Sequence, residues 1–105
     1  MIARIWHGYT NYENAFTYEA MLKEEIFSGI EKRKIKGFID IQLLMRELEA
    51  EVEFITIMRF DSLDSVKEFA GNDYENAVIY PDAKSLLLRY DERSQHYEVR
   101  HSLSA

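Results

Sequence analysis

The chain of 105 residues is 47% hydrophobic and 30% charged, a composition typical of a folded globular domain and not of a disordered segment. Its 19 acidic and 13 basic residues give a net charge of −6, which disfavours a protein that binds nucleic acid through its phosphates. The absence of cysteine excludes disulfides, thiolate catalysis and cysteine-ligated metals.

The sequence predicts neither a signal peptide nor a membrane span. Its first residues lack the basic stretch and apolar core of a signal peptide. No uncharged apolar run approaches the roughly 20 residues that cross a bilayer. We therefore expect one domain over residues 1–105, located in the cytoplasm, with neither a membrane nor a nucleic acid as its partner.

Residues 1–9 alternate in a way that predicts a first strand, with Arg4 and Trp6 on one face and His7 on the other. The Thr-x-x-Glu sequence at residues 10–13 has the form of a capping box, so we expect a helix from there to about residue 30. Its expected core stripe is formed by Ala15, Tyr18, Leu22 and Ile26, widened by Phe16, Ala20 and Phe27. The basic run at residues 32–36 suits a solvated helix end, with an anion-binding patch as the alternative.

The middle of the chain predicts two strands, over residues 38–49 and 52–60, and then a helix over residues 63–70. Ser62 is expected to cap this helix, and Gly71 is expected to end it in the left-handed conformation. Both strands carry large apolar residues in both phases, so both faces of their sheet need to be covered.

The last third of the chain predicts a short helix over residues 73–80 and a second helix over residues 81–88, with Pro81 at its first position. A polar link over residues 90–94 leads to a final strand over residues 95–101. The order β-α-β-β-α-β predicts an α+β, ferredoxin-like monomer with two helices on one face of an antiparallel sheet. A homodimer that pairs the open sheet faces would cover the second face.

The sequence resembles the antibiotic biosynthesis monooxygenases, a family of dimeric α+β barrel proteins, over nearly the whole chain. The residues that carry this likeness are the opening Met-Ile-Ala-Arg-Ile-Trp-His-Gly, residues 60–73, the pair Tyr80-Pro81 and the closing His-Tyr-Glu-Val. The resemblance implies a dimer whose two sheets form a barrel, with a pocket between sheet and helices. It also implies oxidation of a small phenolic aromatic by dioxygen without metal, flavin or other cofactor.

A haem-degrading branch of the same superfamily relies on an asparagine in the first strand, a tryptophan in the second helix and a histidine about ten residues later. Trp6 and Phe69 stand at the first two of these positions, and the third falls near Ile79 or Tyr80. These departures disfavour haem degradation, although tyrosine can also ligate haem iron.

The expected site draws on imidazoles and aromatic hydroxyls. The candidates for catalysis are His7, Tyr80 and His96, and the candidates for substrate binding are Trp6, Tyr18, Phe69 and Tyr74. Packing in the core or at a dimer interface is the alternative for each of them. No metal motif is present, and His96 and His101 point to opposite faces of a strand.

Arg4 and Arg59 lie inside predicted strands, where a buried guanidinium needs a carboxylate, which Asp40, Glu98 or a partner chain would supply. An anion-holding role in the pocket is the alternative for these arginines. The leading functional hypothesis is a cofactor-independent monooxygenase that acts on a small aromatic molecule. The second is a non-enzymatic small-ligand binder or stress-related barrel, which would be favoured if the pocket is filled by its own side chains.

Overall fold

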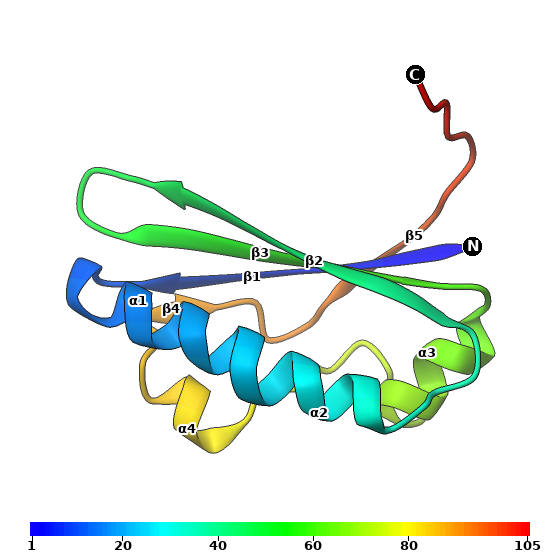
Figure 1. Ribbon diagram of the computed structural model, residues 1–105, viewed down its shortest axis with the longest axis horizontal. Coiled ribbons are helices and arrows are strands. Elements are labelled where there is room, and N and C mark those ends of the chain that lie inside the picture. The colour runs from blue at the N-terminus through cyan, green and yellow to red at the C-terminus, as the bar shows by residue number, and fades with distance from the viewer.

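A single antiparallel sheet carries all the helices on one of its faces in the computed structural model, which describes residues 1–105 (Figure 1). In chain order the elements are β1 (Ile2–Thr10), α1 (Tyr12–Met21), the π-helical turn η1 (Leu22–Ile26), α2 (Phe27–Lys32), β2 (Phe38–Glu47), β3 (Val52–Phe60), α3 (Leu63–Ala70), α4 (Pro81–Lys84), β4 (Arg89–Tyr90) and β5 (Gln95–Glu98). The strand order is β2-β3-β1, and both β4 and β5 pair with the outer edge of β1. The predicted α+β, ferredoxin-like fold is confirmed.

The register of the sheet decides which side chains face the helices. Arg4 of β1 pairs with Met58 of β3 on one side and with His96 of β5 on the other. Because side chains alternate along a strand, Trp6 and Arg4 share the face that the helices cover, and His7 lies on the opposite face. This alternation in β1 is as predicted.

The core lies between the sheet and the helices and has two neighbouring parts. One part surrounds Phe60 and Val66, both fully buried, at the end where α2 and α3 meet the sheet. The other surrounds Tyr18 and Phe54, where α1 and α4 meet it. Burial of one such side chain contributes roughly 1.5–3 kcal/mol to folding.

The first helical segment begins one residue later than its capping box suggests. Asn11 is the cap, because its side-chain oxygen accepts a hydrogen bond from Asn14 N at 2.7 Å. Thr10 instead belongs to β1, and its buried hydroxyl has no partner. The predicted Thr10 cap is therefore wrong, as is the inward position of Phe16, whose side chain is 83% exposed.

The strand–helix unit from β3 to α3 forms as predicted. Ser62 caps α3 by accepting a hydrogen bond from Ser65 N at 3.3 Å. Gly71 ends the helix with a φ of 90° and a ψ of −178°, an extended backbone with positive φ that glycine adopts at little cost, in place of the predicted left-handed conformation.

The segment between α3 and β5 differs most from the prediction. Residues 73–80 form turns and an isolated bridge between Asn76 and Arg93 instead of a helix. Polar side chains compete with a helical backbone here, since Asn76 bonds Asp73 and Arg93 bonds Asp73 and Glu75. The helix that begins at Pro81 ends at Lys84, an unpredicted strand β4 follows, and β5 ends at Glu98.

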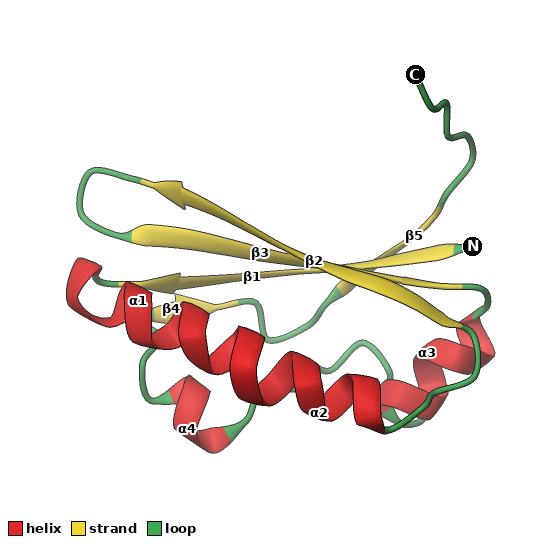
Figure 2. Ribbon diagram, in the orientation of Figure 1, coloured by secondary structure: helices red, strands yellow, loops and turns green.

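The second face of the sheet carries no helix, as Figure 2 shows, and the C-terminal tail leaves the sheet on this side. Half-buried Ile5, Ile55 and Ile57 lie along its middle. Beside them Arg59 pairs with Asp40, as the sequence suggests. None of the helices has the length and apolarity needed to cross a bilayer.

Candidate functional site

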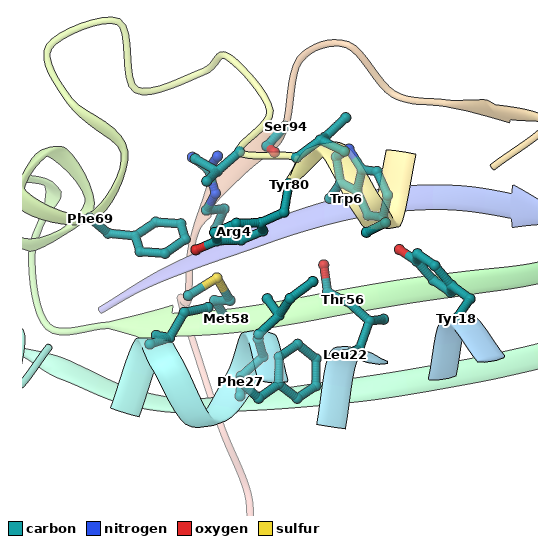
Figure 3. A pocket seen from close by; sticks show the side chains of 16 residues that line it. Arg4, Trp6, Tyr18, Leu22, Phe27, Thr56, Met58, Phe69, Tyr80 and Ser94 are labelled. Atoms are coloured by element: carbon teal, nitrogen blue, oxygen red, sulfur yellow. The ribbon is translucent and has the colours of Figure 1, made fainter. Parts of the chain in front are cut away.

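A cavity of about 60 Å³ lies between the covered face of the sheet and the helices, with 13 of its 16 lining residues hydrophobic. The strands contribute Arg4, Trp6, Ile41, Thr56 and Met58; the helices contribute Tyr18, Leu22, Ile26, Phe27, Ile30, Phe69 and Ala83; the irregular segments contribute Val78, Ile79, Tyr80 and Ser94. In Figure 3, Trp6 and Tyr18 stand at one end of this set and Arg4 and Phe69 at the other, with Tyr80 extending between them.

The Trp6 end of the cavity is held rigidly. The indole Nε1 donates a hydrogen bond to the Asp91 carbonyl at 2.7 Å, and the ring stacks on Tyr90 at a centroid distance of 6.4 Å. Gly8 is needed beside it, because a Cβ at this position would collide with the indole ring. The indole is therefore a fixed apolar wall.

Tyr18 projects from α1 and packs edge-on against Phe54, with ring centroids 5.0 Å apart. Its hydroxyl has no hydrogen-bond partner in the protein and points into the cavity in Figure 3. Burial raises the pKa of this hydroxyl above its usual value. Tyr18 therefore stays protonated at neutral pH and can donate a hydrogen bond to a ligand.

The Arg4 end holds a buried cation, because this side chain is only 3% exposed. Its Nη1 donates to the Tyr74 carbonyl and to His96 Nε2, the latter at 2.9 Å, and its Nη2 donates to the Asn76 carbonyl at 3.0 Å. The guanidinium carbon lies 5.4 Å from the centre of the Phe69 ring.

No carboxylate of its own chain pairs with Arg4, so the predicted ion pair with Asp40 or Glu98 is wrong for this residue. Backbone carbonyls of the loop after α3 and the face of Phe69 take its place. Burial lowers the pKa of Arg4 from its usual value to about 10, so the side chain remains charged at neutral pH.

His96 lies behind Arg4 and does not line the cavity. Its Nε2 accepts from Arg4, which places its proton on Nδ1, a buried atom without a partner. Burial first and the charge of Arg4 second lower the pKa of His96, while Glu75 opposes them. Tyr74 is also outside the cavity, with its ring packed edge-on against His96 at 5.1 Å.

His7 lies on the other face of the sheet, away from the cavity. Its Nδ1 is 2.7 Å from Asp91 Oδ2, and its backbone N–H donates to the same oxygen at 3.0 Å. It therefore shares no pocket with Trp6, and it is not placed to act as a base there. The period of the strand already separates residues 6 and 7.

Tyr80 lies in the irregular segment before α4 and is 38% exposed, and its hydroxyl has no partner in the protein. Together with Ile26 it borders both the cavity and an outer groove of about 420 Å³. The cavity has room for a few water molecules, whereas a benzene-sized ligand needs about 150 Å³. An aromatic ligand therefore requires lining side chains to rearrange, and Tyr80 and Ile26 are the two that lie next to the outer groove.

The turn η1 shapes the wall that the long helix presents. A π-helical turn widens the helix locally and is often found at functional sites. It includes both Leu22 and Ile26, and each of them lines the cavity.

The donor set of the cavity does not fit haem. No imidazole reaches it, which leaves Tyr18, Tyr80 and Met58 as the side chains that could approach an iron. A volume of about 60 Å³ also leaves no space for a macrocycle. Elsewhere, no three histidine or acidic side chains gather in a way that could hold a metal ion.

No protein-family model matches the chain, and no curated protein sequence does so significantly. Solved structures match it along its whole length. A candidate antibiotic biosynthesis monooxygenase from Bacillus cereus is 20% identical with a TM-score of 0.66, covering 99% of this chain and 97% of that one.

Two further structures extend this comparison. The haem degrader MhuD from Mycobacterium tuberculosis, with two haems in its active site, is 13% identical with a TM-score of 0.69, covering 99% of this chain and 100% of that one. SnoaB, a cofactor-independent oxygenase from Streptomyces nogalater, is 17% identical with a TM-score of 0.60, covering 99% and 98%. These likenesses show a shared fold, in agreement with the resemblance seen in the sequence.

Proposed function

We propose that this chain, which has the fold of the antibiotic biosynthesis monooxygenases, is a cofactor-independent monooxygenase that oxidises a small phenolic aromatic with dioxygen. The observation that carries the proposal is the cavity itself. It joins fixed aromatic walls, the unpaired hydroxyls of Tyr18 and Tyr80, and one buried cation. Apolar walls that exclude water strengthen every polar contact made inside them.

In the proposed reaction the ionised phenol supplies an electron to dioxygen. The resulting radical and superoxide combine at a ring carbon that carries hydrogen, which forms a carbon–oxygen bond. One oxygen atom stays on that carbon as the carbonyl of a quinone, and the other leaves as water, which takes the hydrogen of that carbon and one proton from solvent. The protein orients the ring, excludes solvent and donates hydrogen bonds to the phenolic oxygen.

The proposed roles follow the geometry. Trp6 and Phe69 are apolar walls, and the hydroxyls of Tyr18 and Tyr80 are hydrogen-bond donors. Since His7 lies on the far face of the sheet and His96 is bonded to Arg4, no imidazole in the cavity removes the phenolic proton. The proposed substrate therefore enters as the anion or loses its proton to water.

Oxygen uptake tests the proposal. The protein is incubated with a panel of phenols and naphthols, and product masses are compared under ordinary and oxygen-18 dioxygen. We expect protein-dependent uptake with one labelled atom per product, and an approximately tenfold or larger loss of rate in Tyr80→Phe. Tyr97→Phe, a change on the exposed far face, should keep the rate. Absence of protein-dependent uptake with every phenol contradicts the proposal.

The small cavity favours a second candidate, a barrel protein that binds a small ligand without chemistry or has only a structural role. At about 60 Å³ most of the pocket is filled by its own side chains. This candidate predicts aromatic binding without oxygen uptake, or no binding at all.

We also propose that the protein is a homodimer joined through the open sheet face. Half-buried Ile5, Ile55 and Ile57 and the 41% exposed Leu44 form an apolar strip there that no helix covers. A second copy would supply a matching face, and the cavity on the opposite side of the sheet would remain accessible.

A further inference from the structure

Arg4 lines the cavity and keeps unused hydrogen-bonding capacity there. Its five N–H groups make three hydrogen bonds within the protein, all from Nη1 and Nη2. The N–H of Nε and one N–H of Nη2 have no acceptor in the protein. Leaving donors of a buried charged group unpaired costs free energy unless a ligand or water completes them.

The same two nitrogens hold oxyanions elsewhere in this chain. Arg59 uses Nε and Nη2 to bind the two carboxylate oxygens of Asp40, with Nε at 2.9 Å. Arg46 uses Nε and Nη2 to bind Glu53, at 3.0 Å and 2.7 Å. Arg4 thus presents the donors that bind an oxygen anion, but no protein carboxylate takes them.

The surroundings of Arg4 also favour an anion. The titratable groups that line the cavity are Arg4, Tyr18 and Tyr80, and no aspartate or glutamate is among the lining residues. The other hydrogen-bond partners of Arg4 are neutral His96 and the carbonyl groups of Tyr74 and Asn76, so none of them carries a negative charge. A positive charge in such a dry, apolar site attracts a single negative charge strongly.

We propose that the cavity takes its ligand as a compact aromatic oxyanion whose oxygen pairs with Nε and Nη2 of Arg4. This inference rests on the proposed function, since it concerns the substrate of the same site. It makes Arg4, and not a histidine, the group that keeps the phenol ionised. A neutral aromatic of the same shape binds more weakly because it leaves the cation unpaired.

The test uses 4-nitrophenol, whose anion absorbs visible light, together with benzoate and neutral nitrobenzene. We expect the protein to bind 4-nitrophenol as the anion and to lower its apparent pKa, seen as added absorbance at a pH where the free probe is partly protonated. Benzoate should compete, because a carboxylate offers the same oxygens. Nitrobenzene should bind at least about tenfold more weakly.

Two variants at position 4 and one control variant test whether binding of the anion depends on Arg4. Arg4→Gln should weaken nitrophenolate binding by on the order of 10- to 100-fold, and Arg4→Lys should retain part of it because the charge remains. Arg59→Gln removes a comparable guanidinium on the far face of the sheet and should change nothing. The comparison of charged with neutral probes needs only the unmodified protein, so it decides the question even if the Arg4 variants do not fold.

Equal binding of nitrophenol and nitrobenzene, no binding of any probe, or unchanged affinity in Arg4→Gln would overturn the inference and leave Arg4 as a clamp for the loop after α3. The proposed oxygenase activity is judged separately. Arg4-dependent binding with no oxygen uptake would support the role of Arg4 and contradict the oxygenase activity. Oxygen uptake that survives in Arg4→Gln would support the activity and contradict the role of Arg4.

Discussion

Tyr80 separates the small cavity from the larger outer groove, so its side chain controls the space that a ligand can use. Removing the ring in Tyr80→Ala should join the two volumes and speed the association of 4-nitrophenol several-fold, as measured by stopped-flow absorbance. Tyr97→Ala, which removes an exposed ring from the far face, is the matched control. An unchanged association rate in Tyr80→Ala would mean that ligands enter elsewhere.

His96, the imidazole that accepts a hydrogen bond from Arg4, should make the free energy of unfolding depend on pH. The pKa of His96 is lowered by burial and by Arg4, so the folded chain resists a proton that the unfolded chain accepts. As pH falls through the unfolded value of about 6.5, the free energy of unfolding should therefore decrease, with a slope of at most about 1.4 kcal/mol per pH unit from this group.

Urea unfolding between about pH 7.5 and pH 5 checks this expectation. Replacing the imidazole in His96→Gln keeps an acceptor for Arg4 but removes the titration, so the curve should flatten over that range. His101→Gln, in the exposed tail, should behave like the original protein. Equal slopes in the original protein and in His96→Gln would show that another group causes the pH dependence.

Individual site residues were predictable where alternation or helical spacing decided their direction. Trp6, Tyr18, Phe69 and Tyr80 were all chosen from the sequence, and all line the cavity. The two-residue period of β1 also places His7 on the face opposite Trp6, so the sequence alone separates these two candidates.

Other site residues depended on information that a sequence does not contain. The position of His96 behind Arg4 requires the pairing of β5 with β1. Tyr74 turns away from the cavity because, in the loop after α3, the Tyr74 carbonyl accepts a hydrogen bond from Arg4 and the Tyr74 ring packs against His96. Carbonyl groups of the same loop accept the hydrogen bonds of Arg4 in place of a carboxylate.

At the scale of one element, the cap of α3 is a local feature with a measurable contribution. Ser62 satisfies the backbone N–H of Ser65, which has no partner within the helix. Ser62→Ala should lower the free energy of unfolding by about 1 kcal/mol, measured by urea titration. Ser102→Ala, in the exposed tail, is the control, and a difference below a few tenths of a kcal/mol between the two would contradict the role of the cap.

Helices and strands that are stabilised by local signals were predicted correctly, and a segment held by long-range contacts was not. The segment from β3 to α3 has an apolar run, a cap and a terminal glycine that agree with one another, and it forms as predicted. Residues 73–80 were expected to form a helix, but side-chain bonds from Arg93, 17 to 20 residues further on, hold them in turns. Such long-range contacts cannot be derived from local pattern.

For the whole molecule, the open sheet face predicts assembly. Introducing a charge in Ile57→Glu at the middle of that face should convert a dimer into a monomer, as measured by analytical ultracentrifugation, because an unpaired carboxylate would be buried between the two sheets. Phe16→Glu alters an exposed aromatic on α1 and should leave the dimer intact. A monomer before any substitution would contradict the proposed pairing of sheets.

The proposed function requires the ligand to lie between the sheet and the helices, and an NMR titration locates it. Amide and side-chain shifts of the isotope-labelled protein would be followed as 4-nitrophenol is added. We predict that the largest changes fall on Arg4, Trp6, Tyr18 and Tyr80, around the cavity between sheet and helices. Changes confined to the open face, at residues such as Ile5 and His7, would contradict the assignment of the site.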